Sequence, residues 1–266
     1  MYSEDEILAL MIALMCTLVG WCPFFWQAVW IRGERHPTGV RLPLFLGLAA
    51  AGGLLYVVLT RWSAHDVRDS TPYLGFYAVL GAGWLGLVRP ILDYLDLRLR
   101  DDVLERGNPA SSWAGGGAML GLMACFAGGN IGDGPGWWVV IYSAMLATGT
   151  AFLSWIALDL CTGIADTISI GRDVAAGVRA AGFWIGLGLI LGRAAAGNWV
   201  SFEAANIDFL TYGWPALGLL AVAIGIEREF RPEGSFAKAP LLLQGVLPAA
   251  LYVGEGVVVL YLFGAP

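Results

Sequence analysis

Charged residues are scarce in this sequence of 266 residues. Asp, Glu, Lys and Arg make up 14% of the chain, whereas soluble globular domains carry about 25%. The hydrophobic share is 58%, and the mean hydropathy is +0.69. A water-soluble fold of this size could not bury so much apolar surface. The composition therefore excludes a nucleic-acid-binding protein, a disordered chain, a secreted disulfide scaffold and an ordinary cytosolic enzyme.

The residue types that carry out most enzyme chemistry are also few. The two histidines, His36 and His65, fall in different polar connections, so they cannot together hold a haem inside a bundle. The four cysteines form no Cys-x-x-Cys pair, and no hydrolase, zinc-protease or dinucleotide motif occurs. We therefore expect no catalytic residues, no metal site and no cofactor.

Long hydrophobic runs are what the sequence does contain. A helix of about 20 residues crosses the roughly 30 Å hydrocarbon core of a bilayer. Eight runs qualify: Ile7–Ile31, Leu42–Thr60, Tyr73–Leu92, Trp113–Ala127, Trp137–Leu158, Val174–Gly192, Phe209–Ile226 and Leu241–Phe263. The sequence predicts an all-α polytopic transmembrane bundle of eight spans. It would form a single integral membrane domain over residues 1–266, with no soluble domain and with the lipid bilayer around it.

Basic residues are distributed unequally between the two sides of this topology. Ten lie in the connections that follow spans 1, 3, 5 and 7, and three lie on the opposite side, namely Arg61, Arg68 and Arg193. Basic loops remain in the cytoplasm, so both termini are expected outside. The outer side also carries eight acidic residues, which are either simply tolerated there or attractive to a cation.

Small residues form stripes on the fourth and sixth spans. Gly117 and Gly121 form one Gly-x-x-x-Gly pair, and Gly182 and Gly186 form another. Helices associate in lipid through close approach of their backbones, which small residues permit. We expect these two spans to form the tightly packed centre of the bundle.

A repeat is visible at an offset of 65 residues. Four residues of one stretch correspond to four of another: Ala110, Gly117, Gly121 and Leu122 match Ala175, Gly182, Gly186 and Leu187. Both stretches lead into a crossing in the same direction. This indicates a duplicated helical hairpin, residues 108–160 and 173–228, in parallel orientation.

Ionisable residues inside spans are the candidates for function, since charge at membrane depth is expensive. Glu255 lies between two glycines in span 8, where it either serves an ion path or is hydrated near the interface. Arg179 lies about 9 Å into span 6, on its glycine face. It either extends to the headgroups or pairs with Asp159 or Asp93 at the inner ends of spans 5 and 3.

One part of the chain resembles a known family. The stretches Asp159-Leu160-Cys161-Thr162 and Gly171-Arg172-Asp173-Val174-Ala175-Ala176-Gly177, followed by a Gly-rich span, are similar to a bacterial inner-membrane family known as domain of unknown function 350. The resemblance covers mainly residues 158–230. It implies a location in the bacterial inner membrane and brings no known catalytic residues.

Two functional hypotheses follow from these features. The first is a non-enzymatic integral membrane protein, a subunit or scaffold in a larger inner-membrane assembly. Its partners would be other membrane subunits or further copies of this chain. The alternative is a small-ion or proton channel or transporter that uses Glu255, Arg179 and Asp159.

Overall fold

The computed structural model describes residues 2–30, 38–230 and 240–264, and nearly all of them are helical. Short helices of the 3-10 type (η1) and π type (η2 and η3) accompany the longer α-helices. In chain order the helices are α1 (Glu4–Trp30), η1 (Thr38–Val40), α2 (Leu42–Arg61), α3 (His65–Arg68), α4 (Thr71–Tyr94), η2 (Leu99–Glu105), α5 (Pro109–Gly128), α6 (Trp137–Thr162), α7 (Ile164–Ser169), α8 (Val174–Ala195), α9 (Phe202–Gly213), α10 (Pro215–Glu229), η3 (Leu242–Val246) and α11 (Leu247–Phe263).

Eight helical segments of the described chain are long and apolar enough to cross a membrane. This confirms the predicted all-α bundle of eight spans. The seventh crossing consists of α9 and α10, which meet at Trp214. Pro215 has no amide hydrogen to continue the helical ladder there. The fourth crossing starts four residues earlier than predicted, because the side chain of Asn108 accepts hydrogen bonds from the first free amides of α5 and caps it.

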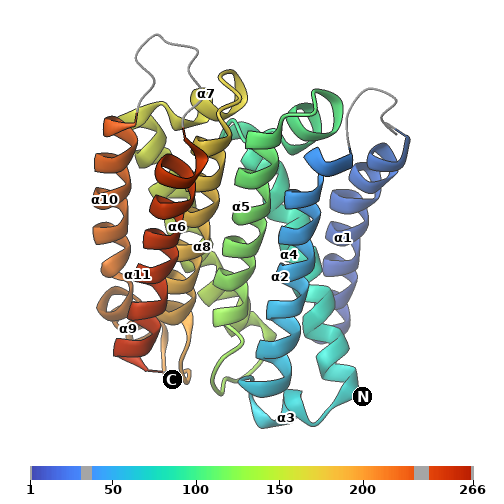
Figure 1. The fold of residues 1–266 in the computed structure, drawn as a ribbon. Coiled ribbons are helices and arrows are strands. Elements are labelled where there is room, and N and C mark those ends of the chain that lie inside the picture. The colour runs from blue at the N-terminus through green and yellow to red at the C-terminus, as the bar shows by residue number, and fades with distance from the viewer. Residues whose placement is uncertain (1, 31–37, 231–239, 265–266) are drawn as a thin grey trace.

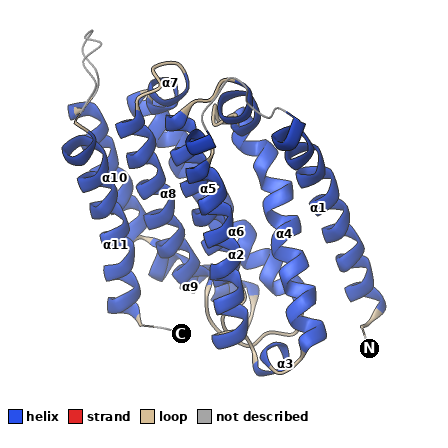
Figure 2. Cartoon of the chain, turned by 45° about the vertical axis from the view of Figure 1, so that its right-hand side comes forward, coloured by secondary structure: helices blue, strands red, loops and turns tan. Residues whose placement is uncertain are grey.

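The crossings are arranged in two rows. In one row α2, α5, α8 and α11 pack side by side, and in the other α1 packs on α4 while α6 packs against α10. Hydrogen bonds from Trp84 to Thr148 and from Trp155 to the carbonyl of Leu95 join α4 to α6. Figure 2 shows α1 and α4 at one edge of the bundle and α10 and α11 at the other. Both termini lie at the same end of the bundle (Figure 1).

Helices of one row begin at regular intervals along the chain. The crossings α1, α4, α6 and α9 start at residues 4, 71, 137 and 202, and α2, α5, α8 and η3 start at 42, 109, 174 and 242. The intervals are therefore 65 to 68 residues throughout. Most side-chain hydrogen bonds between segments distant in the chain span a similar separation, such as Tyr142 to Asn206 between two crossings and Arg172 to Gly107 between two connections. The regularity thus extends over four helical hairpins rather than the two considered from sequence.

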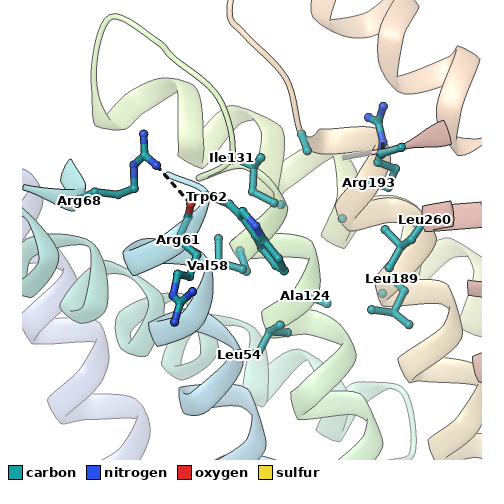
Figure 3. A pocket seen from close by; sticks show the side chains of 16 residues that line it. Leu54, Val58, Arg61, Trp62, Arg68, Ala124, Ile131, Leu189, Arg193 and Leu260 are labelled. Atoms are coloured by element: carbon teal, nitrogen blue, oxygen red, sulfur yellow. Dashed lines mark hydrogen bonds between the residues drawn. The ribbon is translucent and has the colours of Figure 1, made fainter. Parts of the chain in front are cut away.

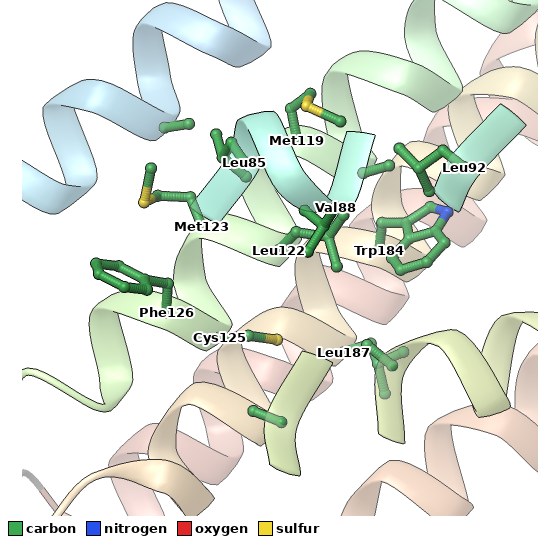
Figure 4. Packing of buried hydrophobic residues seen from close by; sticks show 14 of the residues in the cluster. Leu85, Val88, Leu92, Met119, Leu122, Met123, Cys125, Phe126, Trp184 and Leu187 are labelled. Carbon is green, nitrogen blue, oxygen red and sulfur yellow. The ribbon is translucent and has the colours of Figure 1, made fainter. Parts of the chain in front are cut away.

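The centre of the bundle is α5 and α8. In an apolar stretch of 18 residues from each crossing, 89% of the residues are buried in α5 and 78% in α8. The share is only 22 to 28% in α1, α2, α9–α10 and α11. In Figure 4, Leu85, Val88 and Leu92 of α4 lie close to Met119 and Leu122 of α5 and to Trp184 of α8. The outer helices present their apolar side chains to the surroundings, as lipid contact requires.

Glycines set the distance between helices of the first row. A β-carbon at Gly117 or Gly121 would overlap the backbone of α8, and one at Gly182 or Gly186 would overlap the backbone of α11. The two pairs therefore do not face each other. The face of α8 that meets α5 carries a different set of small residues: Gly177, Gly188 and Gly192. Because α8 has glycine on two faces, it fits closely between two neighbours.

Candidate functional site

A buried ion pair joins α8 to α10. Arg179 donates from Nε to Oε1 of Glu227 at 2.6 Å and from Nη2 to Oε2 at 2.7 Å. The arginine side chain is 1% exposed and that of the glutamate 5%. The remaining guanidinium nitrogen donates to the carbonyl of Gln244, and the ring of Phe230 lies 5.5 Å from the guanidinium carbon. Arg179 thus ties together α8, α10 and η3 with a two-pronged contact.

Helix geometry explains why these two residues meet. Arg179 lies six residues beyond Asp173, whose side chain caps the start of α8, so it stands about 9 Å along the helix. Glu227 belongs to the last turn of α10, which runs in the opposite direction and ends at the same end of the bundle. Removing either partner would leave a buried charge unpaired, which is strongly unfavourable.

The sequence analysis offered Asp159 and Asp93 as partners of Arg179, and that part was wrong. The carboxylate of Asp159 instead accepts a hydrogen bond from the amide of Ala165 at 2.9 Å and holds the start of α7. Asp93 lies in the last turn of α4, with one carboxylate oxygen buried and without a hydrogen bond from any described residue.

Glu227 was missed because the seventh span was predicted to end at Ile226. Its place in a charged run with Arg228 and Glu229 looked typical of a loop. The signal in the sequence that could have revealed Glu227 is Arg179, because an arginine at that depth in span 6 predicts a carboxylate at a similar depth.

Glu255 occupies a different place. It lies in α11 facing α10, and its Oε1 would be 3.4 Å from a β-carbon added to Gly218. No described residue forms a hydrogen bond or ion pair with its carboxylate. It is eleven residues beyond Gln244, roughly 16 Å along the helix from the ion pair. Glu255, Arg179 and Asp159 therefore do not converge on one site.

Two further polar groups at the centre lack hydrogen-bond partners within the described part of the chain. They are the hydroxyl of Tyr252 and the indole nitrogen of Trp184. Tyr252 lies on α11 between the level of the ion pair and that of Glu255. A buried polar atom without a partner is uncommon and marks a place where a water, an ion or a movement can supply one.

No metal centre is apparent among residues 2–30, 38–230 and 240–264, where no three histidine, cysteine or carboxylate side chains come together. No protein-family model, curated protein or solved structure matches the chain.

Proposed function

We propose that this chain is a non-enzymatic membrane protein that serves as a packing subunit of a larger assembly in a bacterial inner membrane. The observation that carries the proposal is the open-ended arrangement of its hairpins. Each inner helix of the first row is packed between two neighbours, whereas α2 and α11 each have one. A parallel array does not close on itself, so its two edges present surfaces on which the packing can continue.

The edges carry the same kind of surface that joins the inner helices. Gly53 of α2 and Gly254 of α11 have no atom within 4 Å of an added β-carbon, and large apolar side chains surround them. Inside the array, glycines in such positions permit close contact between backbones. A neighbouring helix of another subunit, or of a second copy, fits these edges in the way that α8 fits α5.

The test is to purify, from native membranes, variants in which one edge glycine is replaced by leucine. Gly53→Leu and Gly254→Leu should reduce the amount of partner or second copy that is recovered and leave the chain itself monodisperse. Gly149→Leu is the matched control, since Gly149 is equally open but lies on α6, away from both edges. Equal recovery in all three variants, or a wild-type chain that is always a monomer, contradicts the proposal.

We further propose that the arginine-rich end faces the cytoplasm and that both termini are outside. The described arginines outside the helix cores support this orientation, because most lie at the end opposite the termini, among them Arg98, Arg100, Arg106 and Arg172. Basic residues are retained on the cytoplasmic side during insertion. A reporter fused after Gly264 should therefore be accessible from outside intact cells.

A second candidate function is transfer of protons or small ions at the interface of α8, α10 and α11. The specific support is that Glu255 is unpaired and that the unpartnered hydroxyl of Tyr252 lies between it and the buried ion pair. In proteoliposomes, Glu255→Gln should then lower ion or proton flux, while Asp159→Asn, a change outside this interface, should not. Flux equal to that of empty liposomes in the wild type removes this candidate.

A further inference from the structure

A cleft of about 450 Å³ opens at the end of the bundle that carries the termini (Figure 3). Its walls are Leu54 and Val58 of α2 on one side and Leu189 of α8 and Leu260 of α11 on the other. Its floor consists of small residues of α5 and α8: Ala124, Ala127, Gly128, Gly188 and Gly192. The volume falls in the range of about 300–1,000 Å³ that is typical of ligand sites.

The packing of the first row explains why a cleft forms here. Near the arginine-rich end, Gly47 of α2 lies directly against the backbone of Gly116 in α5, and the amide of Leu44 donates a hydrogen bond to the hydroxyl of Ser112 at 3.2 Å. Toward the other end the two helices border the cleft instead. The small residues of α5 and α8 leave this space unfilled.

Three arginines surround the cleft. Arg61 and Arg68 are exposed, Arg68 donates to the carbonyl of Arg61 at 3.3 Å, and no described carboxylate lies within ion-pair distance of either. Arg193 is buried and donates to the carbonyls of Phe263 and Gly264. Its guanidinium carbon also lies 4.4 Å from the centre of the Tyr212 ring, so these contacts hold Arg193 at the rim of the cleft and leave Arg61 and Arg68 as the exposed cations there.

These three are all of the described arginines at this end of the bundle. The other charged groups here are mostly acidic, including Glu4, Glu6, Asp66, Asp133 and Glu203. The three arginines described at this end therefore all line the same apolar cleft. Such an arrangement matches a ligand with one anionic group and a long apolar part, because each part of the ligand meets its complement.

We propose that the cleft binds an anionic membrane lipid. Arg61 and Arg68 attract the phosphate to the mouth of the cleft, and their guanidinium groups suit phosphate oxygens through paired hydrogen bonds. One acyl chain follows the wall from Trp62 toward Leu54, which precedes Arg61 by seven residues, about 10 Å along the helix. Trp62 points into the cleft (Figure 3). It directly follows the end of α2, and indoles at the ends of crossing helices contact lipid headgroups.

The apolar walls distinguish a lipid from a free anion. Inorganic phosphate would contact the arginines alone and would leave the contacts with Leu54, Leu189 and Leu260 unused. A zwitterionic lipid would fill the walls, but its own cation would offset the attraction of its phosphate to the arginines. The proposed ligand therefore needs both a net negative headgroup and an acyl chain.

The experiment is lipid titration of the full chain in detergent, read by native mass spectrometry. Phosphatidylglycerol should bind more tightly than phosphatidylcholine of the same chain length. Arg61→Gln with Arg68→Gln should weaken phosphatidylglycerol binding about 25-fold, since each basic side chain near an anionic headgroup contributes about fivefold. Arg98→Gln with Arg100→Gln, two exposed arginines at the opposite end, is the matched control and should leave binding unchanged.

Two further arms separate the possible outcomes. Ala124→Leu narrows the floor of the cleft, so it should weaken binding of long-chain lipid while the arginines are intact. Inorganic phosphate should not displace the lipid at equal concentration. Equal binding of the two lipids, full binding by the Arg61 and Arg68 double variant, or displacement by equimolar phosphate would each overturn the proposal.

Discussion

Loss of one partner of the buried pair should destabilise the bundle strongly, and loss of both should not. In Glu227→Gln, Arg179 remains charged and 1% exposed but without its two bonds to a carboxylate. Breaking a buried ion pair in this way costs about 3–5 kcal/mol. The bond from Arg179 to the carbonyl of Gln244 remains and offsets only a part of that loss.

The double variant Arg179→Met with Glu227→Leu removes both charges and keeps similar side-chain volume. Apolar replacement of a whole buried pair is often neutral or stabilising. We therefore expect it to be at least about 2 kcal/mol more stable than Glu227→Gln, in a reversible unfolding titration with a denaturing detergent. The control is Arg98→Gln, which breaks the exposed pair with Asp96 and should cost less than about 1 kcal/mol.

A small cost for Glu227→Gln, no larger than that of the control, would contradict a desolvated ion pair between Arg179 and Glu227. It would mean that water reaches the pair in the membrane. A double variant as unstable as the sum of its two single variants would also refute it, since the two residues would then not be coupled.

Three further predictions concern packing, charge and capping. Gly121→Leu should prevent folding or lower thermal stability sharply, because the added side chain overlaps the backbone of α8, whereas Gly149→Leu should be tolerated. Burial raises the pKa of Asp102, which lies outside the spans. The protonated form is then favoured by folding, so the free energy of unfolding should fall as pH rises through the raised pKa, and Asp102→Asn should abolish this slope. Asn108→Ala should cost about 2 kcal/mol in unfolding titrations, because it removes both the cap of α5 and a 2.8 Å hydrogen bond to the carbonyl of Ile168.

The crossings could be predicted from sequence because each is a local property. In lipid, a run such as Leu42–Thr60 has to form its backbone hydrogen bonds within itself. Its hydrophobicity alone therefore predicts a helix. The residues at which the crossings begin and end are harder to predict from the sequence. The fourth crossing begins at a cap, Asn108, and the seventh extends past Ile226 to a charged residue. Hydrophobicity alone signals neither.

The arrangement of the crossings depends on tertiary contacts that single residues do not reveal. Gly182 and Gly186 are recognisable as a close-packing pair, yet the sequence does not say that they face α11 while Gly188 and Gly192 face α5. The depth of Arg179 in its span predicts a carboxylate partner but does not identify Glu227 as that partner. The three arginines of the sparsely charged end can be read from the sequence. That they line one cleft follows from how α2 and α11 flank the closely packed pair of α5 and α8.

The most direct test of the eight-span arrangement is accessibility of single cysteines placed in a cysteine-free version of the chain. Positions 3 and 264 lie at the end of the bundle that carries the termini, and position 100 lies at the opposite end. With a membrane-impermeant reagent, we expect labelling at 3 and 264 in intact cells, and at 100 only after the membrane is opened. Labelling of one terminal position without the other would contradict this arrangement.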